Sequence, residues 1–219
     1  MNPIEIRAFE SPGFAENAYI VRRSGARPAV AIDPGAAAPE MVRAVKADGL
    51  EVVAIVLTHA HVDHVEGVPA MKEATDAPIW MHPADMPLYD RASQQAAFFG
   101  MRVGDLPGID HELSDGQTLD LAGVTFDVVH VPGHSPGHVI LHIAEAGAAI
   151  VGDVIFHGSI GRTDLPGGDF HQLIAGIREK VFSLPPATVL HTGHGPPTTV
   201  EHERATNPFL IPHYGGGLA

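Results

Sequence analysis

The chain has 219 residues, a length that fits one domain over residues 1–219. It has no cysteine, which excludes disulfides and a thiol nucleophile. Its formal net charge of -13, from 13 basic and 26 acidic residues, argues against nucleic acid and an anionic membrane surface as partners. No apolar run approaches the roughly 20 residues of a membrane helix. The first residues, Met1 to Glu5, show neither the basic start nor the apolar segment of a secretory signal, so we expect a cytoplasmic protein.

The first part of the sequence alternates apolar runs of strand length with helical patterns. Strands are predicted at residues 4–9, 18–23, 28–32, 52–57 and 78–82. A helix is predicted from Pro39 to Gly49, since proline is typical of the first helical turn and glycine of the end. A second, short helix is predicted after the fourth strand, where Val68 and Met71 have helical spacing.

Residues 83–112 have no clean periodicity and contain many turn-forming glycines and prolines. We predict a loop-rich insertion there. Insertions of this length are often lids or binding segments. The alternative is a plain surface excursion that Phe98 and Phe99 anchor to the core.

The β pattern returns after Asp115-Gly116. A hairpin is predicted at residues 118–121 and 124–128, with further strands at 138–144, 148–152 and 187–190. Asp169 and Gln172 have the spacing of a capping box and predict the start of a helix. Strands in two groups, each followed by helices, predict an α/β fold of two sheets covered by helices.

A cluster of polar side chains directly follows the predicted strand at 52–57. His59, His61, Asp63 and His64 fall within six residues of the chain. Imidazole and carboxylate groups suit divalent zinc, iron or manganese. A solvated loop is the usual setting of a lone histidine, but not of this cluster at the end of a buried strand.

Three more apolar runs end in candidate ligands, which are His134, Asp153 and His194. If these strands share a sandwich, their ends can meet at one edge. The seven candidate ligands are then His59, His61, Asp63, His64, His134, Asp153 and His194. Seven are too many for one tetrahedral zinc, and they fit two metal ions that share a bridging carboxylate and a hydroxide.

The stretches Thr58 to His64 (T-H-A-H-V-D-H), Pro132 to His138 (P-G-H-S-P-G-H), Gly152-Asp153 and Gly193 to Gly195 resemble the metallo-β-lactamase superfamily. The nearest resemblance is to short single-domain hydrolases related to glyoxalase II. The resemblance implies a four-layer αβ/βα sandwich with two mixed sheets. It also implies two divalent metal ions, with zinc favoured and iron or manganese as alternatives.

The resemblance also implies how the ligands divide. Metal site one would take His59, His61 and His134, site two would take Asp63, His64 and His194, and Asp153 would bridge them. The implied activity is hydrolysis of a small-molecule thioester, such as S-lactoylglutathione, by a metal-bridging hydroxide that Asp63 orients. The chain ends soon after Asn207-Pro208-Phe209, without the helical domain that contacts glutathione in larger glyoxalase II enzymes. The thiol carrier, the acyl group and a homo-oligomeric state therefore stay open.

Two residues are candidates for binding substrate. Arg162 could pair with a substrate carboxylate, or form a structural ion pair with Asp164 or Asp169. His157 could face the cleft, or be an ordinary half-exposed histidine. Asp33 could accept a hydrogen bond from a ligand imidazole, or only fix its Asp-Pro-Gly turn. No role is predicted for the remaining histidines, which are His82, His111, His130, His138, His142, His171, His191, His202 and His213.

Three alternatives to a thioester hydrolase remain. One is a persulfide dioxygenase of the same fold, which uses one iron held by two histidines and one aspartate; here His194 would be superfluous. Another is a hydrolase of a different substrate, such as another ester, a lactone or a β-lactam. The last is a metal-binding protein without activity. The complete set of seven candidate ligands argues against it.

Overall fold

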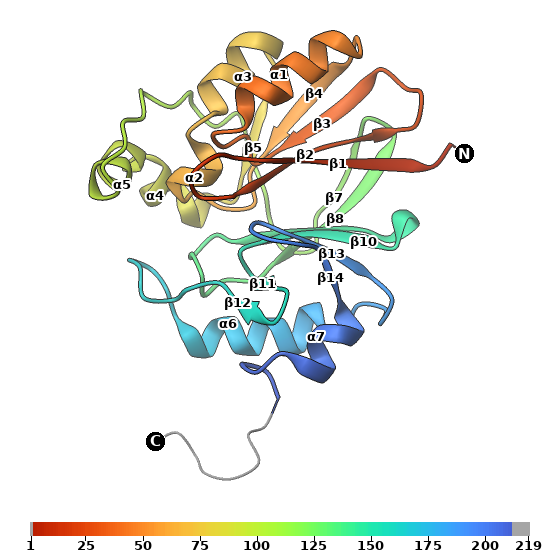
Figure 1. The fold of residues 1–219 in the computed structure, drawn as a ribbon, viewed down its shortest axis with the longest axis vertical. Helices are drawn as coiled ribbons and strands as arrows, with labels where there is room; N and C mark the ends of the chain where they lie inside the picture. The colour runs from red at the N-terminus through yellow and green to blue at the C-terminus, as the bar shows by residue number, and fades with distance from the viewer. Residues whose placement is uncertain (1, 212–219) are drawn as a thin grey trace.

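The computed structural model describes residues 2–211; Met1 and residues 212–219, which include His213, lie outside the described part. The chain forms a sandwich of two mixed sheets with helices on both outer faces (Figure 1). This confirms the predicted α/β fold of two mixed sheets covered by helices. Within residues 2–211, no helix has the length and apolar content needed to cross a membrane.

The first sheet is built from the amino-terminal part of the chain. Its strands, in spatial order, are β1 (Ile4–Glu10), β2 (Asn17–Arg23), β3 (Pro28–Ile32), β4 (Glu51–Val56), β5 (Ile79–Met81) and β6 (His111–Glu112). The first three strands pair antiparallel, and β3 to β6 pair parallel. Helices α1 (Ala38–Ala47) and α3 (Val68–Thr75) cover the outer face of this sheet (Figure 1).

The second sheet is built from the carboxy-terminal part. Its strands, in spatial order, are β14 (Thr198–Thr199), β13 (Val189–Thr192), β10 (Ala148–Gly152), β9 (Val139–Ile143), β8 (Val124–His130) and β7 (Thr118–Leu121). Its outer face is covered by α6 (Phe170–Gly176), the π-helical turn η3 (Ile177–Val181) that continues it, and α7 (Val200–Thr206) (Figure 1). A small hairpin, β11 (Ile155–Phe156) and β12 (Ser159–Ile160), follows β10, and the 3-10 turn η2 (Ala144–Ala146) joins β9 to β10.

Side-chain alternation along the strands explains the layers. In β3, Val30 and Ile32 pack between the two sheets, whereas Ala29 and Ala31 pack against the helices outside. The inner core also contains Phe126 of β8. Three apolar layers result, one between the sheets and one under each set of helices, and they hold the strand ends in fixed positions.

The prediction of a loop-rich insertion at 83–112 was wrong for its first half. Three short helical elements lie there, which are η1 (Pro83–Asp85), α4 (Met86–Tyr89) and α5 (Ala92–Phe98). These helices are too short to show a periodic pattern, yet Tyr89, Ala92 and Ala96 are buried at helical spacing. They lie beside α2 (Val62–Val65), at the end of the sandwich (Figure 1). Residues 83–98 therefore form a packed wall; lid motion stays a prediction.

The remaining strand predictions differ from the structure only at their ends. The last predicted strand, 187–190, is β13 at residues 189–192. Helix α7 and the short strands β6, β11, β12 and β14 were not predicted, since segments of two to seven residues carry little periodic signal.

Candidate metal centre

All seven predicted ligands lie at the same end of the sandwich, in segments that follow strands. β4 leads into His59 and His61 and then into α2, which carries Asp63 and His64. The loop after β8 carries His134, β10 leads into Asp153, and β13 leads into His194. The sequence expectation that these strand ends meet at one edge therefore matches the geometry.

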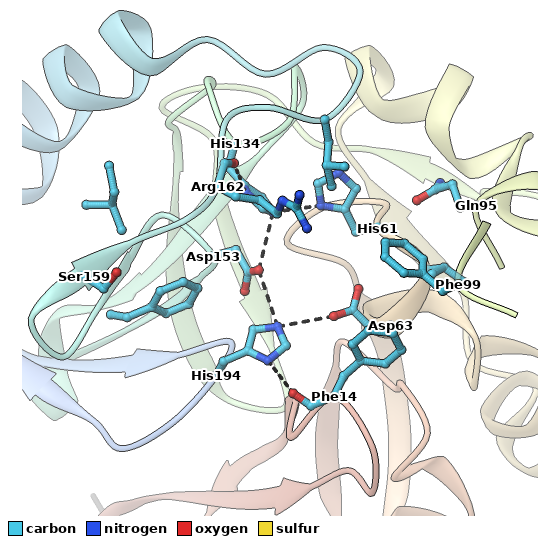
Figure 2. Close-up of a pocket in the computed structure, with 14 residues that line it drawn as sticks. Phe14, His61, Asp63, Gln95, Phe99, His134, Asp153, Ser159, Arg162 and His194 are labelled. Carbon is cyan, nitrogen blue, oxygen red and sulfur yellow. Dashed lines mark hydrogen bonds and ion pairs between the residues drawn. The ribbon is translucent and has the colours of Figure 1, made fainter. Parts of the chain in front are cut away.

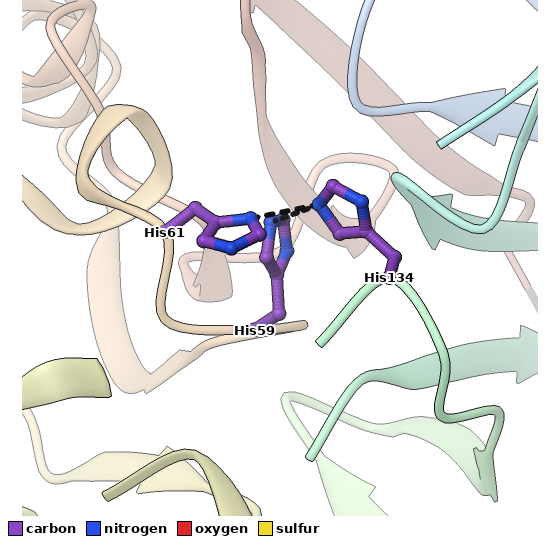
Figure 3. A group of neighbouring side chains, drawn as sticks. All are labelled: His59, His61 and His134. Atoms are coloured by element: carbon purple, nitrogen blue, oxygen red, sulfur yellow. Dashed lines mark hydrogen bonds between the residues drawn. The ribbon is translucent and has the colours of Figure 1, made fainter. Parts of the chain in front are cut away.

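The first group consists of His59, His61 and His134 (Figure 3). The Nε2 atom of His134 lies 2.8 Å from Nδ1 of His61 and 3.2 Å from Nε2 of His59. Around a tetrahedral zinc with bonds of about 2.0–2.1 Å, ligand nitrogens are about 3.3 Å apart. Both nitrogen pairs thus have nearly the separation that one metal ion requires, and all three nitrogens lie within 4.8 Å of one another.

The second group consists of Asp63, His64 and His194. Oδ2 of Asp63 lies 3.3 Å from Nε2 of His194 and 4.0 Å from Nε2 of His64. Asp153 lies between the two groups (Figure 2): its Oδ2 is 3.4 Å from Nε2 of both His134 and His194, and its Oδ1 is 3.3 Å from Nε2 of His64. One carboxylate therefore faces both groups.

Several buried atoms of this centre have no hydrogen-bond partner in the described part of the chain. Among them are Nε2 of His64 and Oδ1 of Asp153. Burial, followed by the charge of neighbouring imidazoles, lowers the pKa of His59 well below its ordinary value. Burial likewise lowers the pKa of His61 to about 3. His59 and His61 are therefore neutral at pH 7, which is the form that metals bind.

Asp153 and Asp63 outweigh burial at His64 and His194 and raise the pKa of both rings, so a cation would displace a proton there. The nitrogen and carboxylate donors and the unpartnered buried atoms fit divalent cations.

In three of the candidate ligand histidines, the Nδ1 atom, which faces away from the metal groups, forms a hydrogen bond. Nδ1 of His64 donates to Oδ2 of Asp33 (3.1 Å). This is the first of the two roles considered for Asp33, as acceptor for a ligand imidazole. Nδ1 of His134 donates to the carbonyl of Arg162 (2.7 Å), and Nδ1 of His194 to that of Phe14 (3.0 Å). Such contacts fix the orientation and tautomer of a ligand imidazole.

Asp85 supports the centre although the sequence gave no sign of it. Its Oδ2 accepts hydrogen bonds from the amide of Ala60 (3.0 Å) and the hydroxyl of Ser135 (2.7 Å), and its Oδ1 from the amide of Gly137 (2.5 Å). Asp85 therefore ties the loop of His59 and His61 to the loop of His134. A lone carboxylate within a predicted loop carries no signal of such contacts.

His138, for which no role was predicted, is fully buried beside the ligands. Its ring stacks on that of His59, with centroids 4.6 Å apart, and its Nε2 accepts a hydrogen bond from the amide of Asp153 (3.0 Å). It thus contacts one residue of the first group and the backbone of Asp153, whose carboxylate lies between the groups. Its place four residues after His134 in one motif was the available signal.

Glu16 is a second buried group that the sequence did not indicate. Both of its carboxylate oxygens lack a hydrogen-bond partner among the described residues, and Oε1 lies 4.0 Å from Nδ1 of His64. Burial, more than the nearby Asp33 and Asp63, raises the pKa of Glu16 to about 9. Before a cation binds, Glu16 is therefore a neutral acid at pH 7.

Gly193 is required by the close approach of Asp153. A Cβ atom at Gly193 would lie 2.1 Å from Oδ1 of Asp153 and 2.9 Å from Cε1 of His64. Any side chain there would displace the carboxylate that faces both groups.

The two candidate substrate-binding residues differ in position. Arg162 lies at the cavity, but its guanidinium forms two hydrogen bonds to Asp164, of 2.8 and 2.9 Å, as in the structural alternative. His157 lies outside the cavity, with its ring 4.8 Å from that of His202. This placement does not fit the idea that His157 faces the cleft.

A cavity of about 330 Å³ opens over the centre (Figure 2). Polar residues of both groups form its floor. Its lining residues are Phe14, His61, Val62, Asp63, Gln95, Phe99, His134, Asp153, Phe156, Ser159, Ile160, Arg162, Leu165 and His194. A small substrate in this cavity would reach both groups of candidate ligands.

Comparison with known proteins gives a family match. The metallo-beta-lactamase superfamily model matches residues 11–194. Hydroxyacylglutathione hydrolase GloC of Haemophilus influenzae is 38% identical over 189 residues, which are 83% of this chain and 87% of that protein.

Two solved structures are also similar along nearly their whole length. The B3 metallo-beta-lactamase BLEG-1 has a TM-score of 0.89 and 35% identity, and the match covers 95% of this chain and 100% of that one. TTHA1623, solved in a di-iron-bound form, has a TM-score of 0.85 and 40% identity, and the match covers 93% of this chain and 100% of that one.

Proposed function

Because the chain belongs to the metallo-β-lactamase superfamily, we propose that it is a binuclear metal-dependent hydrolase of a thioester, either S-lactoylglutathione or a related acyl-thiol. The observation that carries the proposal is the position of Asp153 between two complete groups of ligand atoms. The similarity to GloC favours an acyl-thiol as the substrate.

His59, His61 and His134 would hold one divalent ion, Asp63, His64 and His194 the other, and Asp153 would touch both. Two bound cations supply a water that is ionised near neutral pH and a positive charge for the developing oxyanion. Zinc suits the nitrogen and oxygen donors. Iron is the alternative that the di-iron form of TTHA1623 favours.

Asp63 would orient the attacking water. It lines the cavity, and burial alone would raise its pKa, but His64 and His194 outweigh that effect and lower it. An ionised Asp63 accepts a hydrogen bond and so holds the proton of the water away from the carbonyl carbon.

Two other activities remain as candidates. The similarity to BLEG-1 favours β-lactam hydrolysis as a second candidate. A persulfide dioxygenase would need one iron, two histidines and one aspartate, and the second group of ligand atoms argues against it.

The decisive experiment combines metal analysis with four assays on the purified protein: hydrolysis of S-lactoylglutathione, hydrolysis of simple acyl thioesters, nitrocefin turnover, and oxygen uptake on glutathione persulfide. We expect two metal ions per chain and thioester hydrolysis. One iron per chain with oxygen uptake would establish the dioxygenase instead.

The variant Asp153→Asn tests the shared carboxylate. We expect turnover to fall by about 100-fold or more and the metal content to fall below two ions per chain, because a neutral amide binds cations weakly. Asp120→Asn, at an exposed position, is the matched control. Full activity and full metal content of Asp153→Asn would contradict the assignment.

A further inference from the structure

A second cavity, of about 300 Å³, adjoins the one over the candidate metal centre. The two cavities share four lining residues, which are His61, Gln95, Phe99 and Leu165. The second cavity extends over Leu88 and Phe98 to Pro166. A second space therefore lies directly beside the candidate metal centre, across His61 and Phe99.

The walls of this double cavity are largely aromatic and aliphatic. Phe14 and Phe99 meet edge to face with ring centroids 5.6 Å apart, and Phe98 meets Phe99 in the same way at 5.1 Å. The three rings form one ridge along the opening; Figure 2 shows Phe14 and Phe99 on the side of Asp63. Leu165 faces the ridge from the opposite loop.

The ridge is exposed to an unusual degree. Phe98 is 80% exposed, and Phe14 and Phe99 are 40% and 39% exposed. A contiguous set of exposed large apolar side chains beside a cavity marks a surface that an apolar group covers.

The charges at the cavity do not suit glutathione, which carries two carboxylates. Arg162 is the one lysine or arginine lining the first cavity within the described residues, and Asp164 already neutralises it. Asp63 and Asp153 belong to the candidate metal centre, where bound cations would offset their charge, so neither they nor any side-chain cation of the floor is available to pair with the tripeptide. Arg91 lies in the second cavity, beyond Phe99. One guanidinium at the far end cannot pair with both carboxylates of the tripeptide.

We propose that the natural substrate carries an elongated apolar acyl group, alkyl or aromatic, that runs from the candidate metal centre over Phe99 into the second cavity. The proposal rests on the proposed hydrolase activity and names its substrate class. S-lactoylglutathione, with a short hydroxylated acyl group and a charged carrier, is then a poor substrate.

The test is a series of thioesters of one small neutral thiol, N-acetylcysteamine, with acetyl, butanoyl, hexanoyl, octanoyl and decanoyl groups. Burial of each methylene predicts that kcat/KM rises about two- to fourfold per methylene until the cavity is filled. We expect octanoyl thioester to exceed S-lactoylglutathione by about tenfold or more. A flat series, or a preference for S-lactoylglutathione, would overturn the proposal.

Variants locate the effect. Phe98→Ala combined with Phe99→Ala should lower kcat/KM for the octanoyl thioester about tenfold or more and flatten the series, while the metal content stays at the wild-type value. The matched control is Phe170→Ala, since Phe170 is 44% exposed and lies on α6, outside both cavities. An equal loss in both variants would contradict a role for the ridge.

A binding measurement separates this proposal from the proposed function. Titration calorimetry with octanamide, a neutral apolar acyl probe, should show binding that acetamide lacks and that the double variant loses. If octanamide binds but no thioester is hydrolysed, the hydrolase assignment fails and the apolar site stands. If thioesters are hydrolysed but octanamide does not bind, the apolar site is wrong and the hydrolase assignment stands.

Discussion

At the scale of single residues, Glu16 is a buried acid that meets neither a hydrogen-bond donor nor an ion-pair partner within 3.5 Å among the described residues. Its raised pKa, about 9, follows first from burial. A neutral acid next to Asp33 and Asp63 avoids a further negative charge in the metal-free centre. A bound cation would favour its ionised form instead, so protonation of Glu16 and metal binding are linked.

The variant Glu16→Gln tests this protonation state. In the unfolded chain the pKa of Glu16 is 4.5, and in the folded protein it is about 9. Below pH 4.5 the acid is protonated in both states and costs no stability. As the pH rises from 4.5 towards 9, only the unfolded chain ionises, so the folded protein loses stability. In EDTA, wild-type stability should fall relative to Glu16→Gln by up to about 1.4 kcal/mol per pH unit across that interval. Urea unfolding from pH 5 to 9 measures this difference. Glu40→Gln, on the exposed face of α1, is the control. Parallel pH profiles of Glu16→Gln and wild type would contradict a buried neutral acid.

The sequence predicted the seven candidate ligands and allowed for Asp33 as an acceptor for one of them, but it did not predict the other supporting residues. The ligands share chemistry and follow apolar runs, so local pattern identifies them. Glu16 and Asp85 gain their importance only from contacts across the fold, for example the bond of Asp85 to Gly137, 52 residues away. No local pattern encodes a contact of that range.

At the scale of elements, η1 acts as a clamp between the two ligand-bearing loops. It places Asp85 where three donors of those loops converge. The element is only three residues long: it begins at Pro83 and ends at Asp85, which supplies the carboxylate. Removal of the carboxylate would leave the amides of Ala60 and Gly137 buried without an acceptor.

We therefore expect Asp85→Ala to lower the free energy of unfolding by about 2–5 kcal/mol, the penalty for two unsatisfied buried amides and one lost hydroxyl bond. Denaturant unfolding measures this loss. Affinity for metal should also fall, because the two loops lose their common anchor. Asp90→Ala, in the same segment but exposed, should change stability by less than about 0.5 kcal/mol. Similar effects of both substitutions would show that Asp85 is no anchor.

Elements of at least four residues with an apolar face were mostly predicted within a few residues of their observed ends. The short helices at 83–98 were not, because four to seven helical residues complete at most two turns. Tertiary packing of Tyr89 and Ala96, rather than intrinsic propensity, stabilises them.

At the scale of the whole molecule, the candidate ligands come from both sheets. His59 and His61 follow a strand of the first sheet, whereas His134 and His194 follow strands of the second. Ions bound there would link the two layers at one end, in addition to the apolar core between them.

Metal removal should therefore lower the melting temperature of the whole protein. An ion that binds only the folded state stabilises it by about 3–4 kcal/mol at 100 to 1,000 times its dissociation constant. Differential scanning calorimetry with EDTA, and again after zinc is restored, measures the change in Tm. An unchanged Tm would mean that the cations do not link the layers.

The two large sheets share no strand among the described residues: β1 to β6 of the first lie within residues 4–112, and all strands of the second lie within residues 118–199. One exposed turn around Asp115-Gly116 is thus the covalent bridge between two consecutive halves, each with its own helical cover. Because this turn connects the two halves covalently, it raises the effective concentration of each half near the other. The candidate metal centre therefore lies between the two halves, and neither half alone contains all seven candidate ligands.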